Sequence, residues 1–158
     1  MKKSISYLLL FGFIMSSFPL FPALAQQISV TGQAAESAEK DARSWFEKGA
    51  LLATYGNSNA AIRAFKKAIA IDSGYTEAYF SMGVVYGDMG DYPSAIAAVN
   101  QAIGNEPENG RFYYGRGWIY QLSGVMENAL ADFRKAAGLG NPEAVKYLEE
   151  IATRTPKV

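Results

Sequence analysis

Carboxylates are the main residues in this chain of 158 residues that could perform acid–base or metal chemistry. It contains neither histidine nor cysteine, which excludes a Ser-His-Asp triad, a Cys-His pair and a zinc site built from the usual ligands. Carboxylates remain, and a glycosidase-like mechanism would need two of them facing each other across a substrate. The 15 acidic residues are instead scattered over expected turns and outer helix faces. We therefore expect no catalytic activity and no cofactor.

Two carboxylates, Asp88 and Asp91, lie close together around Gly90 and raise the question of a calcium site. A calcium loop of the EF-hand kind has twelve residues with a fixed ligand series that ends in glutamate, and no such series follows here. Gly-Asp is ordinary turn chemistry. We expect a turn and no metal site, and we expect Gly115 and Gly117 to be packing glycines inside a helix, not a phosphate-binding loop.

The elements that position these residues are indicated by an internal repeat that occurs three times at a constant step along the chain. Small residues and bulky aromatics keep one register over all three periods. A fixed period of this kind is typical of units that cannot bury their apolar faces alone and stack on copies of themselves. The residues in register are Gly49, Gly83 and Gly117; Ala61, Ala95 and Ala129; Ala68, Ala102 and Ala136; Trp45, Tyr79 and Tyr113; and Leu52, Tyr86 and Tyr120.

Each period predicts two antiparallel helices, because large and small residues recur at i, i+4 and i+7 on both sides of a glycine-containing turn. The periods cover residues 42–75, 76–109 and 110–143. A glycine inside a helix costs roughly 1 kcal/mol relative to alanine, so three glycines in one register need a packing reason. We expect the small residues to let the two helices of a hairpin approach closely.

A last helix is predicted over residues 142–153, with residues 154–158 as a tail. Asn141 is suited to cap its start, and Pro142 to occupy its first position. An amphipathic last helix fits the polar cap that a repeat array needs at its open end. The inward face is expected to consist of Val145, Leu148 and Ile151.

The segment before the repeats has the pattern of a secretory signal peptide. Lys2 and Lys3 precede a short apolar run, and Ala23-Leu24-Ala25 offers a small-x-small cleavage site. The run is shorter than the roughly 20 residues needed to cross a bilayer. We expect a signal peptide over residues 1–25, a flexible leader over residues 26–41, and export to the bacterial periplasm or the medium. A retained membrane anchor is the alternative.

The charge balance of the expected mature chain argues against a nucleic-acid partner. Cleavage after residue 25 would leave 13 basic and 15 acidic side chains, whereas nucleic-acid binding needs a clustered basic face. No later apolar stretch is long enough to span a membrane. We expect one domain with neither a nucleic-acid partner nor a membrane span.

The register resembles that of the tetratricopeptide repeat (TPR) proteins, whose 34-residue pattern places Trp, Leu-Gly, Tyr, Ala, Phe and Pro at fixed spacings. The chain departs from it where Lys48 and Arg116 stand in place of Leu, Val99 in place of the aromatic and Ser73 in place of Pro. The resemblance covers three periods. It implies an all-α fold, a right-handed superhelical solenoid of three antiparallel helix hairpins with a capping helix.

In this family the first helix of each hairpin lines a concave groove, and the resemblance carries that role onto this chain by register. The implied groove is rich in aromatic residues, which are typical anchors of interfaces. Alternatively, these rings cover one another or pack on the leader. The partner-binding candidates are Arg43, Phe46, Phe80, Val84, Arg111, Tyr114, Trp118 and Gln121. Further groove positions are Ala50, Ala53, Glu77, Gly87, Asp88 and Leu122.

Some family members hold the C-terminal carboxylate of a partner in a clamp of Lys and Asn. Phe46 and Ala50 stand at those positions here, so we expect no recognition of the acidic tails of heat-shock chaperones. Arg43, Arg111 and Arg116 are candidates for contacting a carboxylate or backbone at the rim of the groove, or else form a solvated surface.

The resemblance implies a protein–protein interaction adaptor or scaffold that binds a partner peptide or helix in the groove. A structural subunit that assembles end to end is the alternative. The polar side of the last helix should seal that end of the array, so we expect a monomer.

Overall fold

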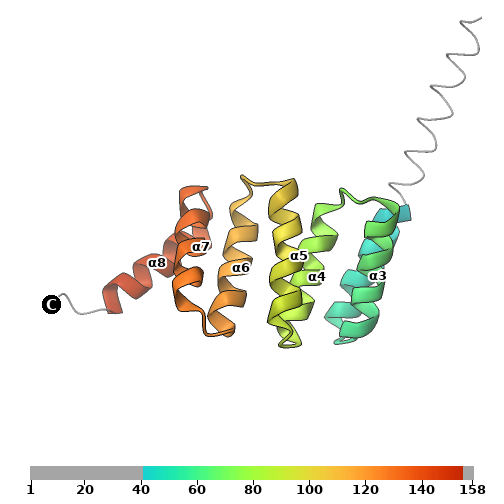
Figure 1. Ribbon diagram of the computed structural model, residues 1–158, viewed down its shortest axis with the longest axis horizontal. Helices are drawn as coiled ribbons and strands as arrows, with labels where there is room; N and C mark the ends of the chain where they lie inside the picture. The colour runs from blue at the N-terminus through green and yellow to red at the C-terminus, as the bar shows by residue number, and fades with distance from the viewer. Residues whose placement is uncertain (1–40, 155–158) are drawn as a thin grey trace, which may run out of the picture. The chain divides into compact units, whose positions relative to one another are not determined.

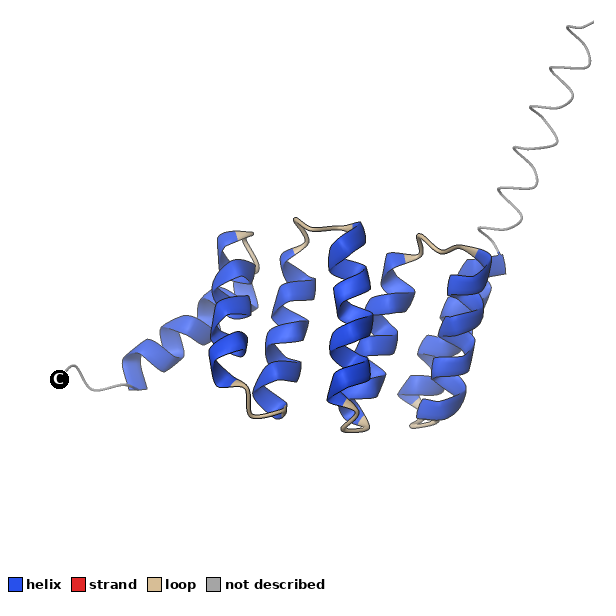
Figure 2. Ribbon diagram, viewed as in Figure 1, coloured by secondary structure: helices blue, strands red, loops and turns tan. Residues whose placement is uncertain are grey.

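The structure is a computed structural model that describes residues 41–154. The predicted signal peptide, nearly all of the predicted leader and residues 155–158 lie outside the described residues. Within residues 41–154 the secondary structure consists of helices joined by short turns, without a strand (Figure 2).

The helices form three antiparallel pairs and one unpaired last helix, and the pairs lie side by side in a row (Figure 1). Each pair corresponds to one period of the repeat. The predicted all-α repeat fold is therefore confirmed. Residues 41–54 are helical and are followed by α3 (Ser58–Ile71), α4 (Thr76–Asp88), α5 (Tyr92–Asn105), α6 (Gly110–Leu122), α7 (Met126–Gly138) and α8 (Pro142–Arg154).

The turn inside each pair depends on a glycine in the left-handed region. Gly56, Gly90 and Gly124 have φ of 74°, 79° and 83°, which costs a residue with a Cβ much more than it costs glycine. The backbone N–H after each of these glycines donates to a carbonyl five residues back, as from Asp91 to Tyr86 at 2.9 Å. This bonding satisfies the last carbonyls of the first helix and turns the chain sharply into the second.

The glycines in register lie where the two helices of a pair touch. A Cβ built on Gly117 would lie 2.7 Å from a ring carbon of Phe133, and one built on Gly83 would lie 2.6 Å from Val99. Gly49 meets Phe65 in the same way. The predicted close approach is thus confirmed, and Val99 occupies the place of the aromatic residue in the second pair.

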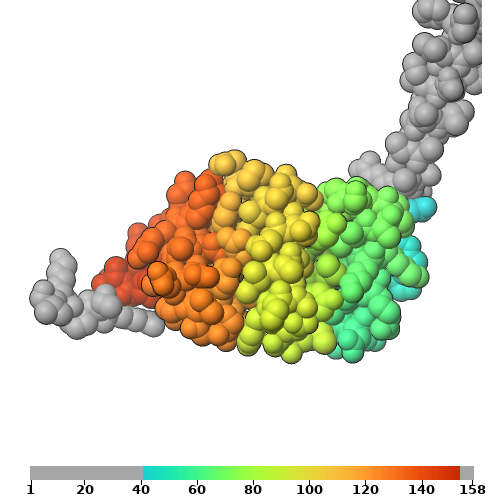
Figure 3. All heavy atoms as spheres, viewed as in Figure 1, coloured from blue at the N-terminus to red at the C-terminus, as the bar shows by residue number. Residues whose placement is uncertain are grey.

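The alanines in register close the rest of the interior. All six are fully buried, and the rings of Phe65, Phe112 and Phe133 fill the spaces between helices. The side chains of successive pairs abut along the row from α3 to α7 (Figure 3). Because each pair contacts mainly its neighbours, the interior is continuous along the row and has no single centre.

The last helix covers the final pair with one face only. Asn141 accepts a hydrogen bond from the Ala144 amide at 2.8 Å, as its capping role predicts. The prediction that Val145 points inward is wrong, since Val145 is 40% exposed. Tyr147 takes that place beside Leu148 and Ile151, because these residues and the buried Ala144 recur at i, i+3, i+4 and i+7 on one face of α8. The axis of α8 is tilted relative to α6 and α7 (Figure 1).

Candidate partner-binding site

Three helices of the array present equivalent positions on one surface. Ala50, Val84 and Trp118 stand at the same position of successive periods and lie on the helix 41–54, on α4 and on α6. Residues at one register of a repeat array face the same way. We call the surface carried by these helices and continued by α8 the first-helix face.

An open pocket of about 330 Å³ lies on this face between the helix 41–54 and α4, and we call it the N-terminal pocket. Small residues leave the space, and Val84 is 40% exposed beside it. Phe65 reaches it from α3, and Asp88 supplies a carboxylate. The lining residues are Ala50, Ala53, Thr54, Phe65, Ser81, Val84, Val85 and Asp88.

A second open pocket, of about 510 Å³, lies between α6 and α8, and we call it the C-terminal pocket. From α6 it receives three of the predicted site residues. From α8 it receives ionisable residues and a tyrosine that were not assigned to the groove from the sequence. The lining residues are Tyr114, Trp118, Gln121, Glu143, Lys146, Tyr147, Glu150 and Ile151.

Trp118 is held by rings on several sides yet remains 36% exposed. Its ring centroid lies 6.2 Å from that of Tyr114 in an edge-to-face arrangement, 5.8 Å from Phe133 and 5.5 Å from Tyr147. The hydroxyl of Tyr147 donates to the side-chain oxygen of Gln121 at 2.8 Å. These contacts fix the orientation of the indole before any partner arrives.

Phe46 and Phe80 contribute less open surface than their register suggested. The ring of Phe46 packs on Phe65 and on Tyr75 at centroid distances of 5.7 and 5.3 Å. Burial raises the pKa of the Tyr75 hydroxyl, and the charge of Arg43 opposes this shift. Both phenylalanine rings are half-buried. A large part of each ring is therefore covered by the chain itself and is not open to a partner.

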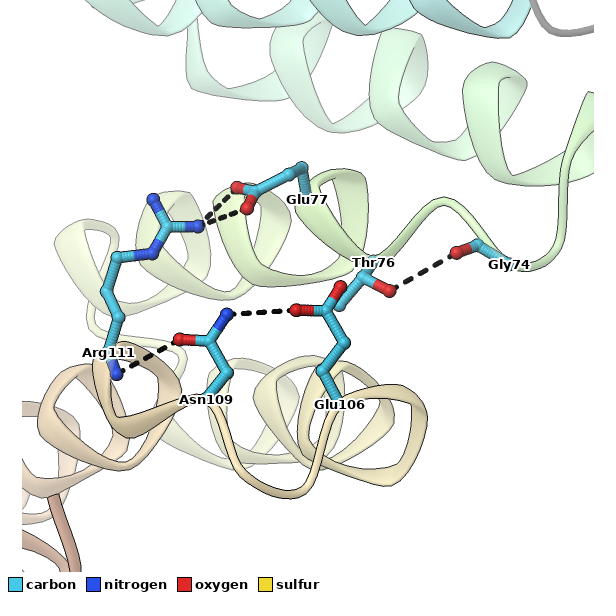
Figure 4. A network of polar contacts seen from close by, with 6 residues as sticks. All are labelled: Gly74, Thr76, Glu77, Glu106, Asn109 and Arg111. Carbon is cyan, nitrogen blue, oxygen red and sulfur yellow. Dashed lines mark hydrogen bonds and ion pairs between the residues drawn. The ribbon is translucent and has the colours of Figure 1, made fainter. Parts of the chain in front are cut away.

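Phe80 is covered by Arg111, which is bound to its own chain. The guanidinium carbon lies 4.8 Å from the centroid of the Phe80 ring, and the guanidinium also contacts the Glu77 carboxylate (Figure 4). The Asn109 side chain caps the start of α6 by accepting from the Arg111 amide at 3.2 Å. Arg111 therefore joins α6 to α4 across one period.

The other two arginines are likewise engaged within the chain. Arg43 donates to Glu47 one turn further on, at 2.9 Å, on an exposed surface. Arg116 donates from two nitrogens to the nearly buried carboxylate of Asp132, both at 2.7 Å, and from a third to Asn100. The hydrogen bond with Asp132 raises the pKa of the Arg116 guanidinium, while burial opposes it. Arg116 thus joins α5, α6 and α7 and does not stand at a rim.

The contribution of α8 to the site was not predicted from the sequence. Tyr147 follows Tyr113 at the same step that separates Tyr113 from Tyr79. This spacing indicated that α8 is equivalent to the first helix of a fourth pair. The signal was weak because Ile151 stands where the three pairs have glycine. That Glu143, Lys146 and Glu150 line the pocket is known only from the packing of α8 against α6.

The two carboxylates near Gly90 lie on either side of the turn, Asp88 at the end of α4 and Asp91 at the start of α5. Asp91 caps α5 by accepting from the Ser94 amide at 3.2 Å, and Asp88 lines the N-terminal pocket. In the part of the chain that the structure describes, no three acidic residues gather as metal ligands would. No helix in that part is both long and apolar enough to cross a membrane.

Family models and solved structures agree on what this architecture is similar to. A tetratricopeptide repeat model matches residues 80–144, and a TPR repeat model matches residues 51–90. No curated protein matches the sequence.

Among solved structures, a crystal structure of MamA is 30% identical, with 67% of this chain and 62% of that chain covered and a TM-score of 0.61. The chain thus spans about three fifths of the length of MamA. The first TPR domain of Spaghetti (RPAP3), bound to the HSP90 peptide SRMEEVD, is 21% identical, with 73% and 94% covered and a TM-score of 0.66. The Arabidopsis OM64 TPR domain is 19% identical, with 75% and 99% covered and a TM-score of 0.67.

Proposed function

Because the chain belongs to the tetratricopeptide repeat family, we propose that it is a non-catalytic adaptor that binds a peptide or helix of a partner protein on its first-helix face. Structures with the same fold include TPR domains bound to a short peptide. We therefore propose that the cellular role of this chain is to bind a partner protein and that it catalyses no reaction.

The observation that carries the proposal is the half-open Trp118 in the C-terminal pocket. An indole that is 36% exposed beside Tyr114 and Tyr147 offers a large apolar area to a partner. Tryptophan and tyrosine are over-represented among the residues that contribute most to binding free energy. The N-terminal pocket, with Val84 at its edge, offers a second apolar contact on the same face.

The mechanism is preorganisation. Trp118 and Tyr114 are already packed on Phe133, so binding a partner costs little side-chain entropy on this side of the interface. The N–H groups of the Gln121 amide remain able to donate to a partner's backbone, because the hydrogen bond from Tyr147 uses only its oxygen.

The test is a pull-down from the native cell envelope with the wild-type chain and with a Tyr114→Ala, Trp118→Ala double variant. We expect the double variant to lose the partner. A Val125→Ala, Met126→Ala variant is the control, because it removes two exposed apolar side chains outside both pockets. Circular dichroism must show the same helix content in all three proteins. Equal capture by the double variant and the wild type would place the site elsewhere.

We propose further that the partner is not an acidic C-terminal tail. Phe46 and Ala50 stand where other family members carry the clamp residues, and Phe46 is engaged with Phe65 and Tyr75. A labelled SRMEEVD peptide, which the Spaghetti domain binds, should show no saturable binding by fluorescence polarisation. Saturable binding abolished by removing the peptide's terminal carboxylate would contradict this.

Export remains part of the proposal. The basic start, apolar run and Ala23-Leu24-Ala25 site support secretion into the periplasm or the medium. Mass spectrometry of the chain produced in a bacterium with its N-terminal segment should show a mature protein that begins at Gln26. An intact Met1 terminus in the membrane fraction would support the retained anchor instead.

End-to-end self-assembly is the second candidate, and one observation favours it. Leu148 and Ile151 of α8, with Arg134 of α7, line an open, largely apolar pocket of about 380 Å³. Size-exclusion chromatography with light scattering decides between the two. A monomer at high micromolar concentration removes the candidate, whereas a mass that rises with concentration supports it.

A further inference from the structure

In the described part of the chain, lysine and arginine side chains lie over several aromatic rings. Lys67 places its ammonium 4.0 Å from the centroid of Trp45, and Lys48 lies 4.9 Å from the same ring. Arg116 lies over Tyr113 and Tyr120. Among the residues whose side chains the structure describes, no Lys or Arg lies over Trp118, the second tryptophan of the chain.

The pocket beside Trp118 carries an excess of negative charge. Glu143 and Glu150 line it, against one cation, Lys146. The residues that face them from α6 are Tyr114, Trp118 and Gln121, which are uncharged. No ion pair forms between these three charged residues and any other described side chain. The pocket therefore has a net charge near −1 and at least one carboxylate without a counter-ion.

Resting on the proposed function, we propose that the C-terminal pocket binds an arginine side chain of the partner, stacked on Trp118 and paired with the carboxylates of Glu143 and Glu150. The partner segment is then positively charged at this point, the opposite of the acidic tails recognised by a carboxylate clamp.

The chain contains the same arrangement in a completed form. The guanidinium carbon of Arg111 lies 4.8 Å from the centroid of the Phe80 ring. The same guanidinium donates to the Glu77 carboxylate (Figure 4). There, a ring on the first-helix face and a neighbouring carboxylate hold one guanidinium. The C-terminal pocket offers the ring and the carboxylates, and the guanidinium is what the partner supplies.

Arginine fits this pocket better than lysine or an apolar side chain. Its planar guanidinium can stack on an indole with one face while its edge donates to carboxylates, whereas the lysine ammonium is a compact and strongly hydrated charge. Tryptophan is the ring that attracts cations best. An apolar side chain would displace water from Glu143 and Glu150 without offering them a hydrogen bond, which is unfavourable.

The experiment is a selection of random heptapeptides displayed on phage against the immobilised full chain. Clones are kept only if they fail to bind a Trp118→Leu variant, so that they report on this pocket. We expect arginine to be enriched among the retained clones relative to the input library. In a synthetic peptide from the selection, replacement of that arginine by glutamine should weaken the Kd on the order of tenfold.

Neutralising the pocket tests the carboxylates separately. A Glu143→Gln, Glu150→Gln variant should weaken the Kd of the same arginine peptide roughly fivefold, as expected for two partly exposed ion pairs. A Glu108→Gln, Glu149→Gln variant has the same net charge but changes residues outside the pocket, and it should bind like the wild type. Equal weakening by both variants would reduce the effect to overall charge and overturn the proposal.

Failure of this inference differs from failure of the proposed function. Clones that depend on Trp118 but lack arginine enrichment, or that are acidic or purely apolar, overturn the arginine proposal and leave the adaptor proposal standing. An absence of any clone that depends on Trp118 overturns both.

Discussion

At the scale of single residues, the glycine positions of this chain divide by what a methyl group would meet. In α6, Gly117 lies against the Phe133 ring so closely that a Cβ would fall 2.7 Å from it. In α5, Gly104 has nothing within 4 Å. The same substitution should therefore have opposite effects at the two sites, although both are helical.

We expect Gly117→Ala to lower the free energy of unfolding by about 1–2 kcal/mol. Overpacking typically costs about 1–3 kcal/mol, and the better helix propensity of alanine returns up to about 1 kcal/mol. Gly104→Ala should raise the free energy of unfolding by about 0.5 kcal/mol, because alanine has the better helix propensity and meets no neighbouring atom. Urea denaturation followed by circular dichroism measures both. A Gly117→Ala protein as stable as Gly104→Ala would contradict the close approach.

Arg116 and Asp132 are a second residue-scale feature, because they replace an apolar pair. The equivalent positions one period earlier are Met82 and Ala98, which are both buried. The repeat pattern marked Arg116 as a departure from the family's leucine, but it did not point to the partner, which lies on the following helix. A charge at an otherwise apolar position needs a counter-ion nearby.

Replacing Arg116 by Met alone should therefore destabilise the chain by about 2–3 kcal/mol, since it leaves the Asp132 carboxylate nearly buried and unpaired. The double variant Arg116→Met, Asp132→Ala reproduces the second pair's arrangement. It should recover most of that loss. The coupling free energy from a double-mutant cycle is the measurement, and strictly additive effects would mean that the ion pair contributes nothing.

At the scale of elements, α8 differs from the helices it follows. The first helix of a complete pair is covered on two sides, so that α6 buries Gly110, Phe112, Gly117 and Ile119, which lie on more than one face. In α8 the buried Ala144 and the half-buried Tyr147, Leu148 and Ile151 share a single face. The sequence predicted an amphipathic helix here, but the choice of Val145 for its inner face was wrong, because Ala144, Tyr147, Leu148 and Ile151 recur at i, i+3, i+4 and i+7 and Val145 lies off that face.

We expect Tyr147→Ala to destabilise the chain by about 2 kcal/mol, because the variant loses the packing of the tyrosine ring on Phe133, whose centroid lies 4.4 Å away. The loss is smaller than for a fully buried aromatic residue, because Tyr147 is only half-buried. Tyr147→Phe should cost about 1 kcal/mol by removing the hydrogen bond to Gln121. Val145→Ala, at an exposed site, should change stability by less than about 0.5 kcal/mol. Urea unfolding ranks the stability of the three variants. A larger loss of stability for Val145→Ala than for Tyr147→Ala would indicate that Val145 does lie on the inner face of α8.

At the scale of the whole array, stability is shared between neighbours. Each pair contacts the next through its second helix and the following first helix, and α4 also touches α6. Pairs in the interior of a repeat array have two neighbours, while those at an end have one. Opening should therefore start at the ends of the described array.

Hydrogen exchange followed by mass spectrometry should show the slowest amides in α4, α5 and α6, and faster exchange in α8 and in the helix 41–54. Gly117→Ala should accelerate exchange in α6 and α7 more than in α3. Uniform protection along the array would instead indicate a single cooperative unit.

The sequence by itself determined the repeat, the pairing of helices, the close contact at Gly49, Gly83 and Gly117 and the cap at Asn141. These follow from local spacing repeated three times, and a helix pair is a local structure whose packing pattern is legible along the chain. The register also placed Trp118 on the surface that α6 presents, because that position recurs in each pair.

Only the tertiary structure decided what surrounds those residues. It showed that Arg111 covers Phe80, that Arg116 binds Asp132, and that α8 leans so as to bring Glu143 and Glu150 beside Trp118. Each of these contacts joins two different helices, and they depend on the packing of one helix on another. That packing results from the fit of many side chains at once, so no spacing along the chain encodes it.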